Sequence, residues 1–265
     1  MSAQVSNAKL IQAINQVLDR GEVVALATVI QAPQESKAQP GAKLLVWPQG
    51  RALGSLEDPA LDERVVRDCQ RVFAQREPML LTYPAPAGGE LHVFVEPIEG
   101  APTMLIVGGG HIAQHLAKVG KMVGFRLVVL DDRPAFANRE RFPEADQVIA
   151  ANFVPALQTL PIHPNTYVVI VTRGHQHDED ALRQVIGSDA AYIGMIGSTR
   201  KVCTILARLK AEGVLPQAIE RVHAPIGLNI GAQTPEEIAV SIVAEVINVR
   251  RGGPAETLSM RRRYG

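Results

Sequence analysis

Cysteine is scarce in this 265-residue sequence, which contains only Cys69 and Cys203. The two lie far apart and lack C-x-x-C spacing, so neither a disulfide framework nor a cysteine-rich metal site is expected. Both fall within helical patterns, which predicts that they are buried as small hydrophobic side chains. Neither is therefore a candidate nucleophile.

An excess of charge of either sign is also missing, because Lys plus Arg and Asp plus Glu both number 27. No overall field therefore favours a nucleic acid or an anionic membrane as a partner. The sequence has no apolar run of membrane length, no signal-peptide pattern in its first twenty residues and no internal repeat. We expect a soluble, cytoplasmic protein that recognises its ligand locally.

The length and the hydrophobic content of 46% suit two domains. Residues 97–102 carry two prolines and a glycine without periodicity, which makes them the predicted boundary. Residues 1–100 are predicted to form a small α/β domain, and residues 101–265 a Rossmann-like domain. The fold class is α/β, with a doubly wound parallel sheet in the second domain, because its apolar runs alternate with helical patterns. These runs are residues 104–107, 126–130, 147–149, 167–172 and 191–196.

A glycine-rich turn follows the first of these runs. Gly108, Gly110 and Ala113 match the G-x-G-x-x-[GA] pattern of dinucleotide-binding turns, and Asp131 follows Gly108 by 23 residues, which suits a ribose-binding carboxylate. Asp131 would favour NAD over NADP, although Arg133 complicates that preference, and a solvated strand end is the alternative. The predicted cofactor-binding residues here are Gly108, Gly109, Gly110, His111, Ile112, Ala113, Asp131 and Arg133.

Two further segments should reach the same sheet edge. In the first, Arg173 and Gly174 could hold a phosphate, while His175 and Asp178 are the candidates for catalysis or metal binding; a capped helix start is the alternative. In the second, Ser198 precedes a helix whose start could bind an anion, and plain helix capping explains it equally well. Besides His175 and Asp178, no third His, Cys or carboxylate lies at a spacing typical of metal ligands, so no zinc site is predicted.

Taken together, the motifs of the second domain resemble those of the XdhC/CoxI family, the accessory factors of xanthine dehydrogenase and related molybdenum hydroxylases. The similarity covers about 160 residues and is more specific than the glycine pattern alone. It is carried by residues 107–113, 131–134, 142–143, 173–178, 192–201, 224–228 and 234–242.

The resemblance implies a maturation chaperone rather than an enzyme. Such a factor binds the molybdenum cofactor, as molybdopterin or its dinucleotide form, assists its sulfuration and delivers it to the hydroxylase. The implied partners are a molybdenum hydroxylase client and a cofactor sulfurase, and a homodimer is compatible with the family. The phosphate or diphosphate of the cofactor could lie on the turn at residues 108–113.

The first domain departs from the family pattern after Gly54 and Ser55, where family members often carry a cysteine in a glycine-rich segment. Here residues 56–63 contain no cysteine, so the sequence resembles a divergent member, and the absence argues against direct metal ligation or sulfur transfer. Two alternative functions stay open. One is an NAD-dependent oxidoreductase with His175 as acid or base, and the other is a nucleotide-sensing regulatory subunit.

Overall fold

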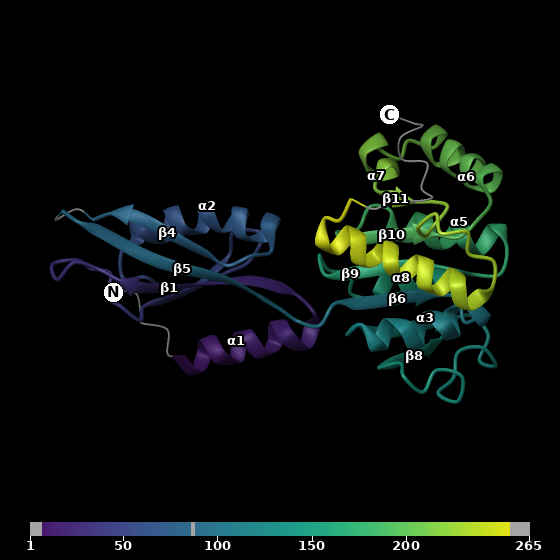
Figure 1. Cartoon of the computed structure of the whole chain (residues 1–265), viewed down its shortest axis with the longest axis horizontal. Coiled ribbons are helices and arrows are strands. Elements are labelled where there is room, and N and C mark those ends of the chain that lie inside the picture. The colour runs from purple at the N-terminus through teal and green to yellow at the C-terminus, as the bar shows by residue number, and fades with distance from the viewer. Residues whose placement is uncertain (1–6, 86–87, 255–265) are drawn as a thin grey trace. The chain divides into compact units, whose positions relative to one another are not determined.

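The computed structural model describes residues 7–85 and 88–254, apart from the side chain of His175. The chain divides into two compact units, Met1–Gly100 and Ala101–Gly265 (Figure 1). Each unit has its own sheet and its own core, so each is described separately.

The first unit is a five-stranded antiparallel sheet of order β3-β2-β1-β5-β4 with two helices. Helix α1 covers one face and α2 the other, as the side view of the strands in Figure 1 shows. Successive side chains of β1 point to opposite faces of the sheet, so Ala25 and Ala27 pack in the core under α2, and Val24 and Leu26 pack in the core under α1. The elements are α1 (Asn7–Arg20), β1 (Val23–Gln31), β2 (Lys43–Val46), β3 (Ala52–Ser55), α2 (Pro59–Gln75), β4 (Met79–Pro84) and β5 (Glu90–Glu99).

The two units divide between Gly100 and Ala101, inside the predicted boundary segment 97–102, although Pro97 at its start still belongs to β5. Pro97 pairs with Ala25 of β1, whereas pairing with β4 ends at Val95. The last residues of β5 thus have a neighbouring strand on one side only, where a proline without an N–H group is tolerated. Only the short stretch after Glu99 connects the two units.

The second unit is a six-stranded sheet of order β11-β10-β9-β6-β7-β8 in which every pair is parallel. The predicted doubly wound sheet is confirmed, and the direction of winding reverses between β6 and β9, where such sheets bind ligands. Helices α4 and α7 have no counterpart in the predicted pattern. The elements are β6 (Thr103–Val107), α3 (His111–Met122), β7 (Arg126–Asp131), β8 (Gln147–Ala150), α4 (Phe153–Thr159), β9 (Thr166–Ile170), α5 (His175–Val185), β10 (Tyr192–Met195), α6 (Thr199–Ala211), α7 (Pro216–Glu220), β11 (Val222–His223) and α8 (Pro235–Arg251).

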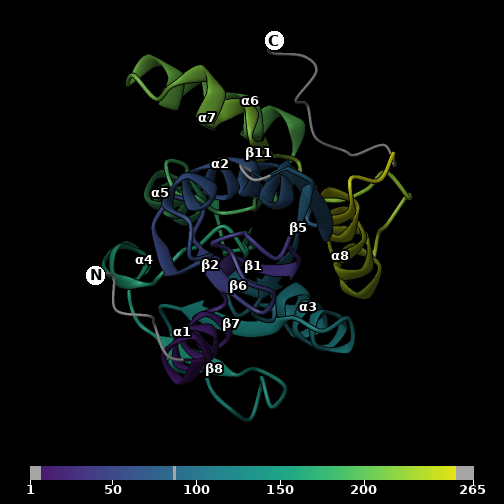
Figure 2. The same ribbon diagram turned by 90° about the vertical axis from the view of Figure 1, so that its left-hand side faces the viewer.

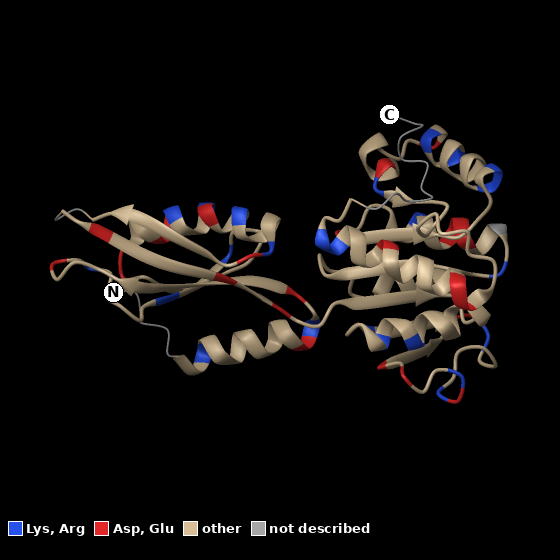
Figure 3. Ribbon diagram, viewed as in Figure 1, with Lys and Arg blue, Asp and Glu red and all other residues tan. Residues whose placement is uncertain are grey.

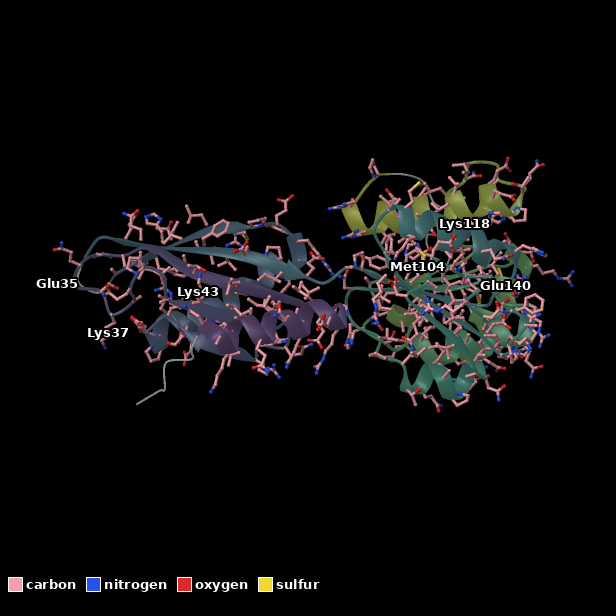
Figure 4. The ribbon with its side chains drawn as sticks, turned by 90° about the horizontal axis from the view of Figure 1, so that it is seen from below. Glu35, Lys37, Lys43, Met104, Lys118 and Glu140 are labelled. Atoms are coloured by element: carbon pink, nitrogen blue, oxygen red, sulfur yellow. The ribbon has the colours of Figure 1, made fainter. Side chains whose placement is uncertain are left out.

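Helices cover both faces of this sheet. Residues of α3 and α8 pack with Met104 and Ile106 on one face, and residues of α4, α5, α6 and α7 pack with Leu105 and Val107 on the other. Figure 2 shows α3 and α8 on one side of the strands, and Figure 4 shows Met104 inside this unit. The glycine turn after β6 and the loop after β9 both leave the sheet at the carboxyl ends of their strands, where a site can form.

The start of α8 is fixed by a capping box. Thr234 Oγ1 accepts from the Glu237 amide, while the Glu237 carboxylate accepts from the Thr234 amide. Threonine, proline and glutamate at positions 234, 235 and 237 are the sequence pattern typical of such a helix start. Acidic and basic side chains are interspersed over both units (Figure 3), and no described helix is both long enough and apolar enough to span a membrane.

Candidate functional site

The glycine turn after β6 contains two glycines that the fold requires and one that faces open space. Gly108 has φ +109°, and a Cβ there would lie 2.5 Å from the Val171 carbonyl oxygen. A Cβ on Gly109 would lie 2.5 Å from the Phe136 carbonyl oxygen, whereas a Cβ on Gly110 would meet nothing within 4 Å. Gly110 is therefore the position at which a ligand could approach the backbone closely.

Helix α3 begins directly behind this opening. Its N-cap is Gly110, which supplies no side-chain cap, and its first turn contains no acidic residue. Ala113 is fully buried, while His111 is exposed and Ile112 half-buried. The first amides of α3 and the positive end of its dipole thus provide the donors that suit a phosphate.

Asp131, the predicted ribose acceptor, is used by the protein itself. Its carboxylate is 1% exposed, and Oδ2 accepts from the Gly109 amide at 2.7 Å. Arg133 donates to Oδ1 from its backbone N at 3.0 Å and from Nε at 2.9 Å, and to Oδ2 from Nη2 at 3.0 Å. These four bonds match the roughly four lone-pair positions of a carboxylate. Asp131 thus shapes the turn and has no acceptor position left for a ribose hydroxyl.

The same bonds set the ionisation of Asp131. Burial alone would raise its pKa, but the hydrogen bonds from the Arg133 side chain and from the Gly109 and Arg133 amides outweigh burial, so the pKa lies below the usual value. Asp131 is therefore a permanently charged part of the turn at neutral pH.

A stack of two guanidinium groups on one aromatic ring adjoins the turn. Arg133 Cζ lies 3.6 Å from the ring centroid of Phe136, and Arg141 Cζ lies 4.9 Å from it. Arg141 Nη2 also donates to the Gly109 carbonyl at 3.3 Å and to Gln114 Oε1 at 3.1 Å. Sequence reasoning missed Phe136 and Arg141, whose only signal is their place in the long loop after β7.

The segment after β9 contributes Arg173 and Gly174 to the sheet edge. Gly174 is the N-cap of α5, has φ +99° and provides no side-chain cap. Arg173 Nη2 donates to Asp132 Oδ2 at 3.0 Å, which joins the loops after β9 and β7. The side chain of His175 lies outside the described part of the structure, so its role in catalysis or metal binding stays a prediction.

Asp178, the second catalytic candidate, is completely buried. One of its oxygens accepts from the Thr172 amide at 3.1 Å and from Thr172 Oγ1 at 2.6 Å, and the other pairs with Lys201 Nζ. An enclosed carboxylate with these partners holds the end of β9 to the start of α6. This arrangement favours a structural role over acid–base catalysis or metal binding.

Ser198 has the capping role that the sequence offered as one alternative. Its Oγ accepts from the Lys201 amide at 3.3 Å and so caps α6. Whether Ser198 also contacts a ligand stays a prediction.

A cavity of about 740 Å³ lies between α5 and α6. Most of its cationic side chains are paired, since Glu179 accepts from Arg183 at 2.7 Å and from Arg208 at 2.8 Å, and Lys201 pairs with Asp178. Their charges are therefore largely neutralised within the protein. The lining residues are Gln176, Glu179, Asp180, Arg183, Ser198, Arg200, Lys201, Thr204, Ile205 and Arg208.

A buried polar network lies beneath the loop that follows β11. Glu245 Oε2 accepts from Tyr192 Oη at 2.5 Å and from the Gly227 amide at 2.8 Å, and Oε1 lies 3.4 Å from His223 Nδ1. Burial would raise the pKa of Glu245, but hydrogen bonds from His223, Tyr192 and Gly227 hold it below its usual value. The loop after β11 begins in the core, where Ala224 and Ile226 are buried.

Metal ligands are not assembled in the part of the chain that the structure describes, since no group of three His, Cys, Asp or Glu side chains could hold an ion. Cys69 is fully buried in the first unit, and burial together with the charge of Asp68 raises the pKa of its thiol to about 12. Cys203 is partly buried on α6. The prediction of buried cysteines thus holds fully for Cys69 and in part for Cys203.

The position of the missing family cysteine is occupied by a tight turn into α2. Ser55 Oγ donates to Asp62 Oδ2 at 2.7 Å, and the Leu56 amide donates to Asp62 Oδ1 at 2.7 Å. Asp58 then caps α2 by accepting from the Ala60 amide. No thiol lies in this turn, so its residues do not suit a soft metal.

The sheet order and the open glycine turn define a Rossmann domain preceded by a smaller antiparallel unit. The XdhC Rossmann domain matches residues 104–246, and the XdhC and CoxI family matches residues 17–84. The chain therefore belongs to the XdhC/CoxI family.

Curated relatives agree with this assignment. The chain is 30% identical over 241 residues to the uncharacterized protein YqeB of Escherichia coli (strain K12), a match that covers 87% of this chain and 44% of YqeB. It is 34% identical over 160 residues to a probable xanthine dehydrogenase subunit of Bacillus subtilis (strain 168), covering 60% of this chain and 46% of that protein. The chain thus spans less than half the length of either relative.

Among solved structures, a crystal structure named as a xanthine dehydrogenase from Bacillus halodurans has a TM-score of 0.53 at 20% identity. The match covers 96% of this chain and 99% of that one. At this identity it supports the fold alone.

Proposed function

We propose that this protein is an accessory factor of a xanthine dehydrogenase-type molybdenum hydroxylase, and that it binds the molybdenum cofactor through its phosphate or diphosphate at the glycine turn. Family membership and the names of the relatives support the association with xanthine dehydrogenase. The observation that carries the binding part is the open space at Gly110, beside a helix start without a side-chain cap.

The residues present fit one end of this cofactor better than the other. The first amides of α3 suit a phosphate, and Arg141, which donates to the Gly109 carbonyl, and Arg173, paired with Asp132, are the guanidinium groups that could add to its binding. The glycine turn at residues 108–113 contains no cysteine that could serve as a molybdenum ligand. When bound, the cofactor would supply the metal chemistry of the client enzyme, while this chain would hold the phosphate end and present the rest.

Under this proposal the chain binds and transfers cofactor rather than turning over a substrate. The buried ion pair of Asp178 supports this choice, because it leaves that carboxylate unsuited to acid–base chemistry. Sulfuration of the cofactor would then be performed by a separate sulfurase, with this protein as the holder that meets both the sulfurase and the apo-hydroxylase.

The test is to express the protein in a host that makes the cofactor, to purify it anaerobically, and to measure the molybdenum and pterin bound per chain. We expect the wild type to retain cofactor and Gly110→Ala to lose it, because the added methyl group occupies the open space. Gly187→Ala is the matched control, since Gly187 also faces open space and needs no positive φ. Wild-type protein that carries no cofactor, when a family member purified in parallel does, contradicts the proposal.

The NAD-dependent alternative is distinguished by titration with NAD and NADP. The turn suits any diphosphate, but the acceptor expected for the ribose hydroxyl is already bonded to Arg133 and Gly109. We therefore expect NAD to bind more weakly than the nucleotide-extended molybdenum cofactor, without turnover. A nucleotide-sensing regulator would instead associate with the hydroxylase only when nucleotide is present and would take up no pterin.

A further inference from the structure

An ion pair spans the carboxyl end of β6. Asp132 follows β7 and Arg173 follows β9, and these two strands are the neighbours of β6 on either side. Arg173 Nη2 donates to Asp132 Oδ2 at 3.0 Å. Since the glycine turn leaves the sheet from the end of β6, this ion pair bridges the switch point at which a diphosphate on the turn would lie.

The two partners differ in their freedom to move. The side chain of Arg173 is 51% exposed, whereas that of Asp132 is 17% exposed. A guanidinium has several donors, and the contact with Asp132 uses one of them. Arg173 can therefore turn from the carboxylate to another anion at small conformational cost.

Asp132, in contrast, is held in place and needs a positive charge. Its Oδ1 is buried without a hydrogen-bond partner among the described residues, and it lies 3.7 Å from Arg133 Nε. A partly buried carboxylate that loses its cation is destabilised. Any ligand that draws Arg173 away must compensate for that loss, while Arg133 continues to balance part of the charge of Asp132.

We propose that Arg173 is the phosphate-binding cation of this site and that Asp132 competes for it, so that the site selects ligands bearing a phosphate or diphosphate over uncharged ones. This inference rests on the proposed function. A diphosphate offers the guanidinium two or more charged oxygens in bidentate geometry and displaces the carboxylate. A nucleoside or a pterin without phosphate offers no negative charge at this position, so the ion pair between Arg173 and Asp132 stays intact.

The test is calorimetric titration of the full chain with ADP, and with adenosine as the uncharged ligand. Asp132→Asn removes the competitor and is expected to tighten ADP binding about two- to fivefold, the range of a partly exposed ion pair. Arg173→Gln removes a charged hydrogen-bond donor and is expected to weaken ADP binding roughly tenfold or more. Adenosine binding should be undetectable in all variants.

The double variant separates local competition from a general change in charge. With Arg173→Gln already present, Asp132→Asn should give little further gain, because the group for which it competes is gone. Glu140→Gln is the matched control, since it removes one negative charge from an exposed residue of the same unit (Figure 4). Thermal melts of each variant check that the fold is retained.

Each outcome bears on a different claim. If wild type binds ADP but Asp132→Asn behaves like Glu140→Gln, the competition is refuted and the proposed phosphate site stands. An equal gain from Asp132→Asn with and without Arg173 also refutes the competition, because a general electrostatic effect would then explain it. If neither wild type nor Asp132→Asn binds ADP or the nucleotide-extended cofactor, both proposals fail. Binding by Asp132→Asn alone supports a strong competitor.

Discussion

Three glycine-to-alanine variants test the reasoning on the turn most directly, because the same methyl group meets a different environment at each position. At Gly108 it would lie 2.5 Å from a carbonyl oxygen in a backbone with φ +109°, and at Gly110 and Gly187 it would meet nothing within 4 Å. The effect on folding stability and the effect on ligand binding should therefore appear in different variants. Gly108→Ala should impair folding, Gly110→Ala should impair binding only, and Gly187→Ala should impair neither.

The magnitudes follow from the backbone and the helix cap. A positive-φ conformation without glycine costs about 1–3 kcal/mol, before the carbonyl contact is relieved. For a unit of this size we expect Gly108→Ala to lower Tm by at least about 2 °C, and by more because of the carbonyl contact. For Gly110→Ala, reduced entropy of the unfolded chain contributes about 0.4–1 kcal/mol of stability. The loss of a preferred N-cap residue offsets this by a similar amount, about 0.5–1 kcal/mol.

Binding should respond in the opposite order. A hydrogen bond to a charged group contributes roughly 1.5–3 kcal/mol, so displacing one phosphate oxygen from its amide weakens binding about 10- to 100-fold. Scanning calorimetry gives Tm, and titration with ADP or the nucleotide-extended cofactor gives Kd. A Gly110→Ala protein that has the Tm of the wild type and binds the ligand as tightly would refute the assignment of the open space at Gly110 as the phosphate-binding site.

Three further predictions concern the buried groups. Asp131→Asn should lower the free energy of unfolding by about 2–3 kcal/mol at pH 7 in urea titrations. Because the folded pKa of Asp131 is lowered, its contribution exists above about pH 4 and is lost as the pH falls through the folded pKa, so the variant should lose less stability on acidification. Glu245→Ala should cost about 3–5 kcal/mol, and Glu245→Gln less, since an amide oxygen keeps both accepted bonds. A chromogenic disulfide should label Cys203 in the native protein and Cys69 only after unfolding.

The features predicted correctly from the sequence are those that local rules determine. The pattern of small residues at Gly108, Gly110 and Ala113 is short and sterically demanding, and the capping box at Thr234 involves residues three apart. The parallel sheet could be anticipated because apolar runs alternate with helical patterns along the second unit. The boundary segment contains the observed division, but the extent of β5 through Pro97 could not be predicted, since its pairing depends on where a neighbouring strand stops.

The roles of the charged residues could not be predicted in the same way. Asp131 stands at the expected interval from the turn, but its availability depends on whether Arg133 folds back onto it, which the spacing does not specify. The Arg173–Asp132 pair joins residues 41 positions apart. Glu245 did leave a signal, because a carboxylate on the apolar face of a helix, next to Val246, requires a buried partner.

Under the proposed function, the charges around the turn suggest how the cofactor would be released to the client enzyme. Cofactor held by metal coordination would be released only when a ligand is exchanged at the metal, and the described residues offer no such ligand set. Cofactor held by amides and a mobile arginine would be released when Asp132 recaptures Arg173, a step that needs no chemistry at the metal. The metal end would then stay accessible to a sulfurase and to the client while the phosphate end is bound.

Release of the cofactor should accordingly accelerate with ionic strength, since salt weakens the guanidinium–phosphate contact. Stopped-flow measurement of the dissociation rate at increasing salt concentration would show this acceleration. A dissociation rate that is independent of salt, and unchanged in Asp132→Asn, would contradict this mechanism.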